Sequence, residues 1–206
     1  MVQVLQASQL TLHDVEVRFN LTREKDPNFF PEYLVASPDL TEYQRHTLDQ
    51  AQSDFEYLAR YPVQEELVKM VVLSPLLSVA GFYHHPFRPV AEKVIEIEVE
   101  TNEEVVRGRI DILVLNEQLW VTLIESKGSQ FSWHQGLPQA LTYMMSSPVP
   151  GSIRFGMITN GLDIVFVKLD RDSGQYNFSK TFSLFNPGND LYQVVGILKV
   201  LSQERR

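Results

Sequence analysis

A mostly apolar stretch, GRIDILVLNEQLWVTLIESKG at residues 108–128, contains the charged residues Asp111, Glu125 and Lys127. Burying an unpaired charge is costly, so a sheet core accepts such residues only with solvent or a compensating group nearby. Two carboxylates and a backbone carbonyl are hard oxygen ligands suited to Mg²⁺, and a lysine beside them can orient or help deprotonate an attacking water.

The spacing of these residues supports a shared site. Residues two apart in a strand point to the same face, so Glu125 and Lys127 would project together at the end of an apolar strand. Ser126 would face the other way, but its carbonyl oxygen lies between them. Asp111 falls on the preceding strand, and the short turn between them makes the two strands antiparallel. Depending on the register, Asp111 can approach Glu125 across the pair.

The first part of the chain predicts helices and a loop. Thr11 followed by Asp14 is typical of a helix start, and Thr41 is a suitable cap for a helix that runs to about residue 59. Residues 21–40 are rich in proline and polar groups and predict an ordered arm or loop. Together with the helices they make residues 1–61 an N-terminal helical extension packed on the core.

The core is predicted to begin with a helix from Pro62 to about Ala80. Proline fits the first turn of a helix, and Gly81 is a suitable terminator. Pro75 falls inside the helix and predicts a kink.

From residue 92 the apolar period changes to two, which is typical of a strand with one solvated face. The expected elements that follow are strands at 92–100, 105–115 and 119–127, a helix at 134–146, strands at 153–159, 162–169 and 176–184, and a helix at 189–203. This order predicts an α/β fold with a mixed central sheet flanked by helices, in which residues 62–206 form the core of a single compact domain.

Composition excludes several classes of function. The 206 residues include no cysteine, which rules out disulfides and thiolate metal sites, and no apolar run approaches the roughly 20 residues that span a bilayer. A cytoplasmic location without a membrane partner is the expectation. The net charge of -8 weighs against tight non-specific nucleic-acid binding. Near the motifs, the main candidates for positive charge are Arg107, Arg109, Arg154 and Lys168.

Asp111 followed by Glu125-Ser126-Lys127 at the end of an apolar strand resembles the PD-(D/E)xK nuclease superfamily. The closer resemblance is to the nuclease domain of type I restriction enzyme restriction subunits and their small stand-alone relatives. It covers roughly residues 62–170 and implies a restriction-endonuclease-like core of helix, three strands, helix and strand. It also implies Mg²⁺-dependent phosphodiester hydrolysis, with Mn²⁺ as a substitute ion.

The resemblance implies roles for individual residues. Asp111 and Glu125 would be the metal carboxylates, Ser126 would add its carbonyl as a ligand, and Lys127 would be the catalytic lysine. Relatives with the RecB-type signature carry Q-x-x-x-Y on the following helix, which the segment from Gln139 to Tyr143 matches.

Many relatives also place a metal-binding glutamate on the first core helix. Glu65 is the better candidate because it shares a face with Val68 and Val72, and Glu66 is the alternative. The proline of the superfamily's name is replaced here by Ile110, and this departure matters little because the proline does no chemistry.

Two functions follow as hypotheses. The first is a Mg²⁺-dependent endonuclease that hydrolyses DNA phosphodiester bonds, as a restriction enzyme does, with DNA held in a limited cleft. The second is a non-catalytic nuclease-fold accessory or binding module of a restriction or DNA-processing system. An RNA substrate, a partner subunit and a homodimer stay open.

Other residues have simpler interpretations. Trp120 and Trp133 are more typical of a core or its rim than of base-stacking platforms. His134 fits the start of a helix. The histidines before Pro86 fit a surface loop, and Gln139 with Tyr143 can be a plain helix-surface pair.

Overall fold

A computed structural model describes residues 3–35, 38–99, 104–115, 119–123, 132–146 and 151–203. Within these residues the central feature is one mixed sheet of nine strands. The strands are β1 (Gln3–Gln6), β2 (Thr22–Arg23), β3 (Arg88–Val99), β4 (Glu104–Leu115), β5 (Leu119–Leu123), β6 (Ile153–Thr159), β7 (Asp163–Asp170), β8 (Gln175–Phe178) and β9 (Phe182–Ser183).

The topology of the sheet confirms the predicted fold class. Strands β3, β4 and β5 form an antiparallel meander, and β6, β7 and β8 form a second antiparallel run. Strand β5 pairs in parallel with β6, and the connection between them contains helix α5 (Leu137–Met145). Parallel neighbours need such a crossover. The chain is therefore α/β, with a mixed sheet flanked by helices.

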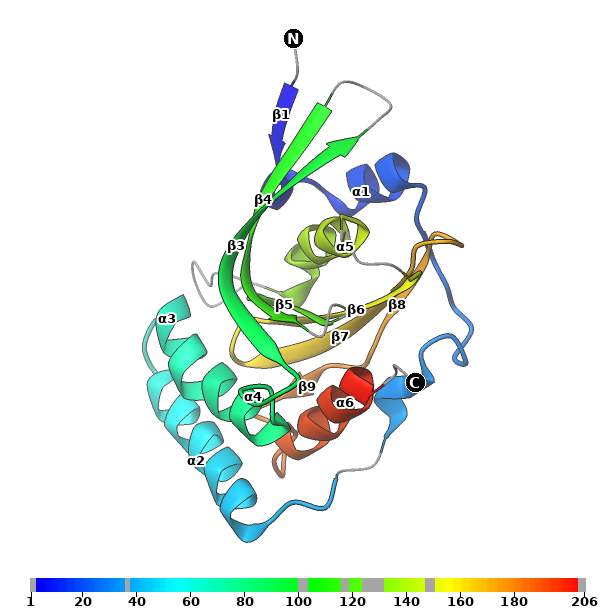
Figure 1. The fold of residues 1–206 in the computed structure, drawn as a ribbon. Coiled ribbons are helices and arrows are strands. Elements are labelled where there is room, and N and C mark those ends of the chain that lie inside the picture. Colours follow the sequence, from blue (N-terminus) through cyan, green and yellow to red (C-terminus); the bar gives the residue numbers. More distant parts are fainter. Residues whose placement is uncertain are drawn as a thin grey trace.

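Helices cover both faces of the sheet, which bends strongly (Figure 1). Helices α1 (Leu12–Phe19) and α5 lie on the concave side, and α2 (Glu42–Leu58), α3 (Glu65–Val68), α4 (Ser74–Ala80) and α6 (Leu191–Gln203) lie on the convex side. Each side has its own apolar core. Ile158, Val165 and Val167 pack with α5, whereas Phe155, Met157 and Phe166 pack with α2, α4 and α6. We call these sides the α5 face and the α2 face.

The two predicted helix starts are confirmed. Thr11 and Thr41 each form a capping box, with the side chains of Asp14 and Gln44 respectively. In each box two backbone N–H groups that lack an intrahelical partner are satisfied. The hydrogen bond from the Thr11 hydroxyl also lowers the pKa of Asp14.

The structure differs in two ways from the helix predicted between Pro62 and Ala80. It begins later, at Glu65, and a π-helical turn, Lys69–Leu73, separates α3 from α4. Pro75 has no N–H and its ring conflicts with the carbonyl four residues earlier. The wide turn therefore ends just before this proline, with the Ser74 N–H donating to the Lys69 carbonyl. Gly81 ends the helix at φ 90°, as predicted.

Three other differences concern short elements. Strands β1 and β2 lie in the N-terminal segment for which only helices and a loop were predicted, and they are recruited by pairing with β4 and β8. The predicted strand 176–184 is divided into β8 and β9. Helix α5 starts at Leu137, after a 3₁₀ turn, η4 (Trp133–Gln135). In the described part of the chain, no helix is both long and apolar enough to cross a membrane.

Candidate active site

The register of β4 gives the position of Asp111 along the sheet. The pairs Ile112–Val121 and Leu113–Trp120 fix the register of β4 and β5, so one further step puts Asp111 level with Thr122. Thr122 pairs with Ile158 of β6, whose side chain packs in the α5-side core. The backbone of Asp111 therefore lies in the row of the sheet that contains Thr122 and Ile158, and its side chain lies outside the described part of the structure.

Glu125, Ser126 and Lys127 lie outside the described residues, which stop on β5 at Leu123 and resume at Ser132. Val121 pairs with Met157, which packs on the α2 face.

Gln139 and Tyr143 form the pair that their spacing on one helix face predicts. The Gln139 Nε2 group donates to the Tyr143 hydroxyl at 2.6 Å. Tyr143 is fully buried in the α5-side core and Gln139 is half-buried, so they are not a solvated helix-surface pair. Helix α5 contacts β4, β5 and β6. The pair thus lies on the helix that covers the α5 face of these three strands.

Glu65 lies near the end of the sheet from which the chain runs on toward Glu125. Leu123 pairs with Thr159, which leads into the β6–β7 turn. In that turn, a Cβ built on Gly161 would come within 2.8 Å of Val68. Glu65 precedes Val68 by about one helical turn, so the start of α3 is beside this end of the sheet.

The structure distinguishes the two candidate glutamates by exposure and partner. The Glu65 side chain is 19% exposed and forms an ion pair with Lys69. Glu66 is exposed. The metal role of either residue stays a prediction.

Sequence reasoning missed one acidic position beside Asp111. The pairs Ala91–Ile112 and Lys93–Ile110 bracket Glu92, which therefore stands level with Asp111 on β3. Only the register reveals it, because its spacing from Asp111 in the sequence has no recognisable pattern.

Two of the four cations considered for substrate binding are ruled out. Arg154 is fully buried, and its Nη1 group donates to the Ile153 carbonyl at 2.7 Å. Lys168 forms a mostly buried ion pair with Glu32 and lies 5.4 Å from the centre of the Phe29 ring. Neither cation can meet a phosphate without rearrangement of the core. The side chains of Arg107 and Arg109 lie outside the described part of the structure.

The donor set fits a hard divalent cation. The carboxylates of Asp111 and Glu125 and the carbonyl of Ser126 are oxygen ligands, which Mg²⁺ and Mn²⁺ prefer, and the chain has no cysteine to favour softer ions. Among the residues that the structure describes, no three His, Asp or Glu side chains gather closely enough to hold a metal.

Comparison with known families gives one relationship. Residues 89–182 match the family described as Type I restriction enzyme R protein N terminus. This segment runs from β3 to β9 and includes Asp111, Glu125, Lys127, Gln139 and Tyr143. The comparison with curated proteins finds no match. The chain thus contains a restriction-enzyme-related segment, in agreement with the coarser part of the resemblance found from the motifs.

Proposed function

We propose that the protein is a metal-dependent nuclease of the PD-(D/E)xK superfamily that hydrolyses DNA phosphodiester bonds in a restriction system. The observation that carries the proposal is the adjacency of β4 and β5. These antiparallel neighbours bring the strand of Asp111 beside the strand that leads to Glu125 and Lys127. The match to the R protein N terminus covers the same strands and supports DNA as the substrate and other subunits as partners.

The proposed mechanism assigns a role to each residue. Asp111, Glu125 and the Ser126 carbonyl would hold Mg²⁺, which when bound would polarise the scissile phosphate. Lys127 would position the attacking water and stabilise the negative charge that develops on the phosphate oxygens. The Gln139–Tyr143 pair would contact the site or the substrate from α5. Glu65 would contribute from α3, and Glu92, which is level with Asp111 on β3, would be a further carboxylate ligand.

A second function, a nuclease-fold module that binds or assembles without cutting, is favoured by the charge distribution. The net charge is -8, Arg154 is buried, and Lys168 is mostly buried in its ion pair with Glu32. Phosphate contacts dominate the affinity of nucleic-acid binders, and these two cations cannot supply them. An accessory module would rely on a partner subunit for DNA contact.

Plasmid cleavage in Mg²⁺ or Mn²⁺ tests the first function. Lys127→Ala should reduce cleavage by a factor of about 100 or more, because it removes a group that acts on the transition state. Lys180→Ala is the matched control, because Lys180 is an exposed lysine outside the proposed site. Circular dichroism and thermal melting establish that both variants fold. Wild-type cleavage by Lys127→Ala would contradict the catalytic assignment.

The neighbouring glutamates of α3 provide a second matched pair. Glu65→Gln should lower cleavage more than Glu66→Gln, since Glu65 is the less exposed of the two. Equal activities would remove α3 from the site. Metal binding by the wild type without cleavage of any DNA tested would instead support the accessory function.

A further inference from the structure

Four side chains from three elements form a continuous stack near the start of α5. The Arg23 guanidinium of β2 lies 4.0 Å from the centre of the Phe178 ring of β8. Phe178 meets Trp133 edge-to-face with ring centres 4.9 Å apart. Trp133 is in turn stacked on His134, with centres 3.7 Å apart and an interplanar angle of 23°. We call these residues the Arg23–His134 stack.

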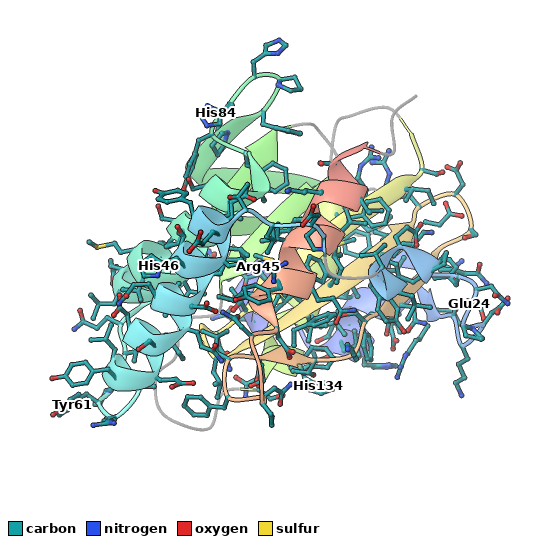
Figure 2. All side chains as sticks on the ribbon, turned by 90° about the horizontal axis from the view of Figure 1, so that it is seen from below. Glu24, Arg45, His46, Tyr61, His84 and His134 are labelled. Carbon is teal, nitrogen blue, oxygen red and sulfur yellow. The ribbon has the colours of Figure 1, made fainter. Side chains whose placement is uncertain are left out.

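The inner and outer members of the stack differ in exposure. Trp133 is 8% exposed and belongs to the α5-side core, which confirms it as a core residue. His134 is exposed (Figure 2). Its ring is held by Trp133 from one side and by a 2.8 Å hydrogen bond between His134 Nδ1 and the Ser132 hydroxyl. The stack therefore presents an aromatic ring to solvent in a fixed orientation.

The position of the stack relates it to the proposed active site. His134 follows closely in the sequence on the segment that contains Glu125–Lys127, and it lies in η4, directly before the helix that carries Gln139. Arg23, at the other end of the stack, is exposed, whereas Arg154 and Lys168 are buried.

We propose that the Arg23–His134 stack binds an unpaired nucleobase of a nucleic-acid strand at the exposed His134 ring, with Arg23 contacting a neighbouring phosphate. This proposal rests on the proposed function and names how the strand is held beside that site. A base has a flat π-face that stacks on an aromatic ring whatever its sequence, and arginine adds a cation–π or phosphate contact. An oriented and exposed ring loses little side-chain freedom on binding, which favours stacking.

Fluorescence anisotropy with a labelled single-stranded oligonucleotide of about 12 nucleotides tests the proposal. The measurement is made at low salt in EDTA, so that binding is separated from cleavage. His134→Ala should weaken binding about tenfold, the loss that removal of one stacking contact produces. His134→Phe keeps an aromatic face and should bind within about threefold of the wild type. Arg23→Gln should reduce the slope of log affinity against log salt by about 0.7, the value for one phosphate of a single strand.

His84→Ala is the matched control. His84 is an exposed loop histidine on the opposite side of the molecule from His134 (Figure 2), and its loss should leave binding unchanged. Equal affinities of His134→Ala and the wild type would overturn the proposal, as would equal losses in His134→Ala and His84→Ala. Binding by His134→Phe as weak as that of His134→Ala would overturn the stacking role.

The experiment distinguishes a failure of the Arg23–His134 stack from a failure of the proposed nuclease function. A wild type that binds the strand through His134 but never cleaves it would support the stack and contradict the nuclease. If the wild type cleaves DNA but its oligonucleotide binding does not depend on His134, the result would support the nuclease and contradict the stack. Absence of any single-strand binding by the wild type would overturn the stack.

Discussion

Gly161 provides a sharp test of how α3 is held against the sheet. It is buried in the β6–β7 turn at φ 92°, and a Cβ built there would lie 2.8 Å from Val68 Cγ2 and 2.9 Å from Phe55 Cε2. Both contacts are core side chains, 3% exposed, so neither can move freely. Gly161→Ala should therefore carry two costs, one from the left-handed backbone and one from the packing conflict.

Gly81 separates these two costs. Its φ of 90° is nearly the same, but nothing lies within 4 Å of a Cβ built on it. Gly81→Ala should destabilise the protein by about 1–2 kcal/mol, the cost of the left-handed conformation alone. Overpacking in a well-packed core costs about 1–3 kcal/mol more. Gly161→Ala should therefore lower the free energy of unfolding by about 2–5 kcal/mol.

Urea denaturation of the wild type and the two variants measures the difference directly. Gly161→Ala should unfold at the lower urea concentration, by a margin equivalent to at least about 1 kcal/mol relative to Gly81→Ala. If the two alanine variants were equally stable, the close approach of the β6–β7 turn to α3 would be refuted. The inferred location of Glu65 at this end of the sheet would be refuted with it.

Three further predictions concern stability. Lys168→Met should lower the free energy of unfolding by about 3–5 kcal/mol, because it leaves the Glu32 carboxylate without its ion-pair partner. The double variant Lys168→Met/Glu32→Leu should recover much of that loss in denaturant unfolding. Thr41→Ala removes the N-cap of α2 and should lower the free energy of unfolding by about 1 kcal/mol, which a lower thermal midpoint would show. The hydrogen bond from the Tyr192 hydroxyl at 2.6 Å lowers the pKa of Asp49 in the folded state. The ionised Asp49 carboxylate therefore stabilises the protein above its unfolded-state pKa, and this stabilisation is lost as the pH falls through its folded-state pKa. Urea titrations at several pH values test this: between about pH 6 and about pH 3, Asp49→Asn should lose less stability than the wild type.

Most of the regular elements could be predicted because their signals are local. The capping boxes at Thr11 and Thr41 and the alternation from residue 92 each depend on neighbouring residues. Strands β1 and β2 could not be predicted. Their four and two residues have little preference of their own, and they become strands by pairing with β4 and β8. Pairing between distant segments leaves no periodic signal in either segment.

The candidate site was predictable in its residue types but not in its geometry. The motif residues are visible in the sequence, yet the side of the sheet on which each lies depends on a register that a one-residue slip reverses. That register sets Asp111 level with Thr122 of β5 and Glu92 of β3 level with Asp111. Likewise, the charges of Arg154 and Lys168 are evident from the sequence, but their burial is a property of the packed core.

Binding of Mn²⁺, followed by isothermal titration calorimetry, tests the central claim most directly. The claim is that Asp111 and Glu125 hold one divalent cation. We expect a saturable site in the wild type, weakened about tenfold or more in Asp111→Asn and in Glu125→Gln and unchanged in the exposed-turn control Asp172→Asn. Absence of Mn²⁺ binding by the wild type at millimolar concentration, or an affinity that neither site variant changes, would contradict the claim.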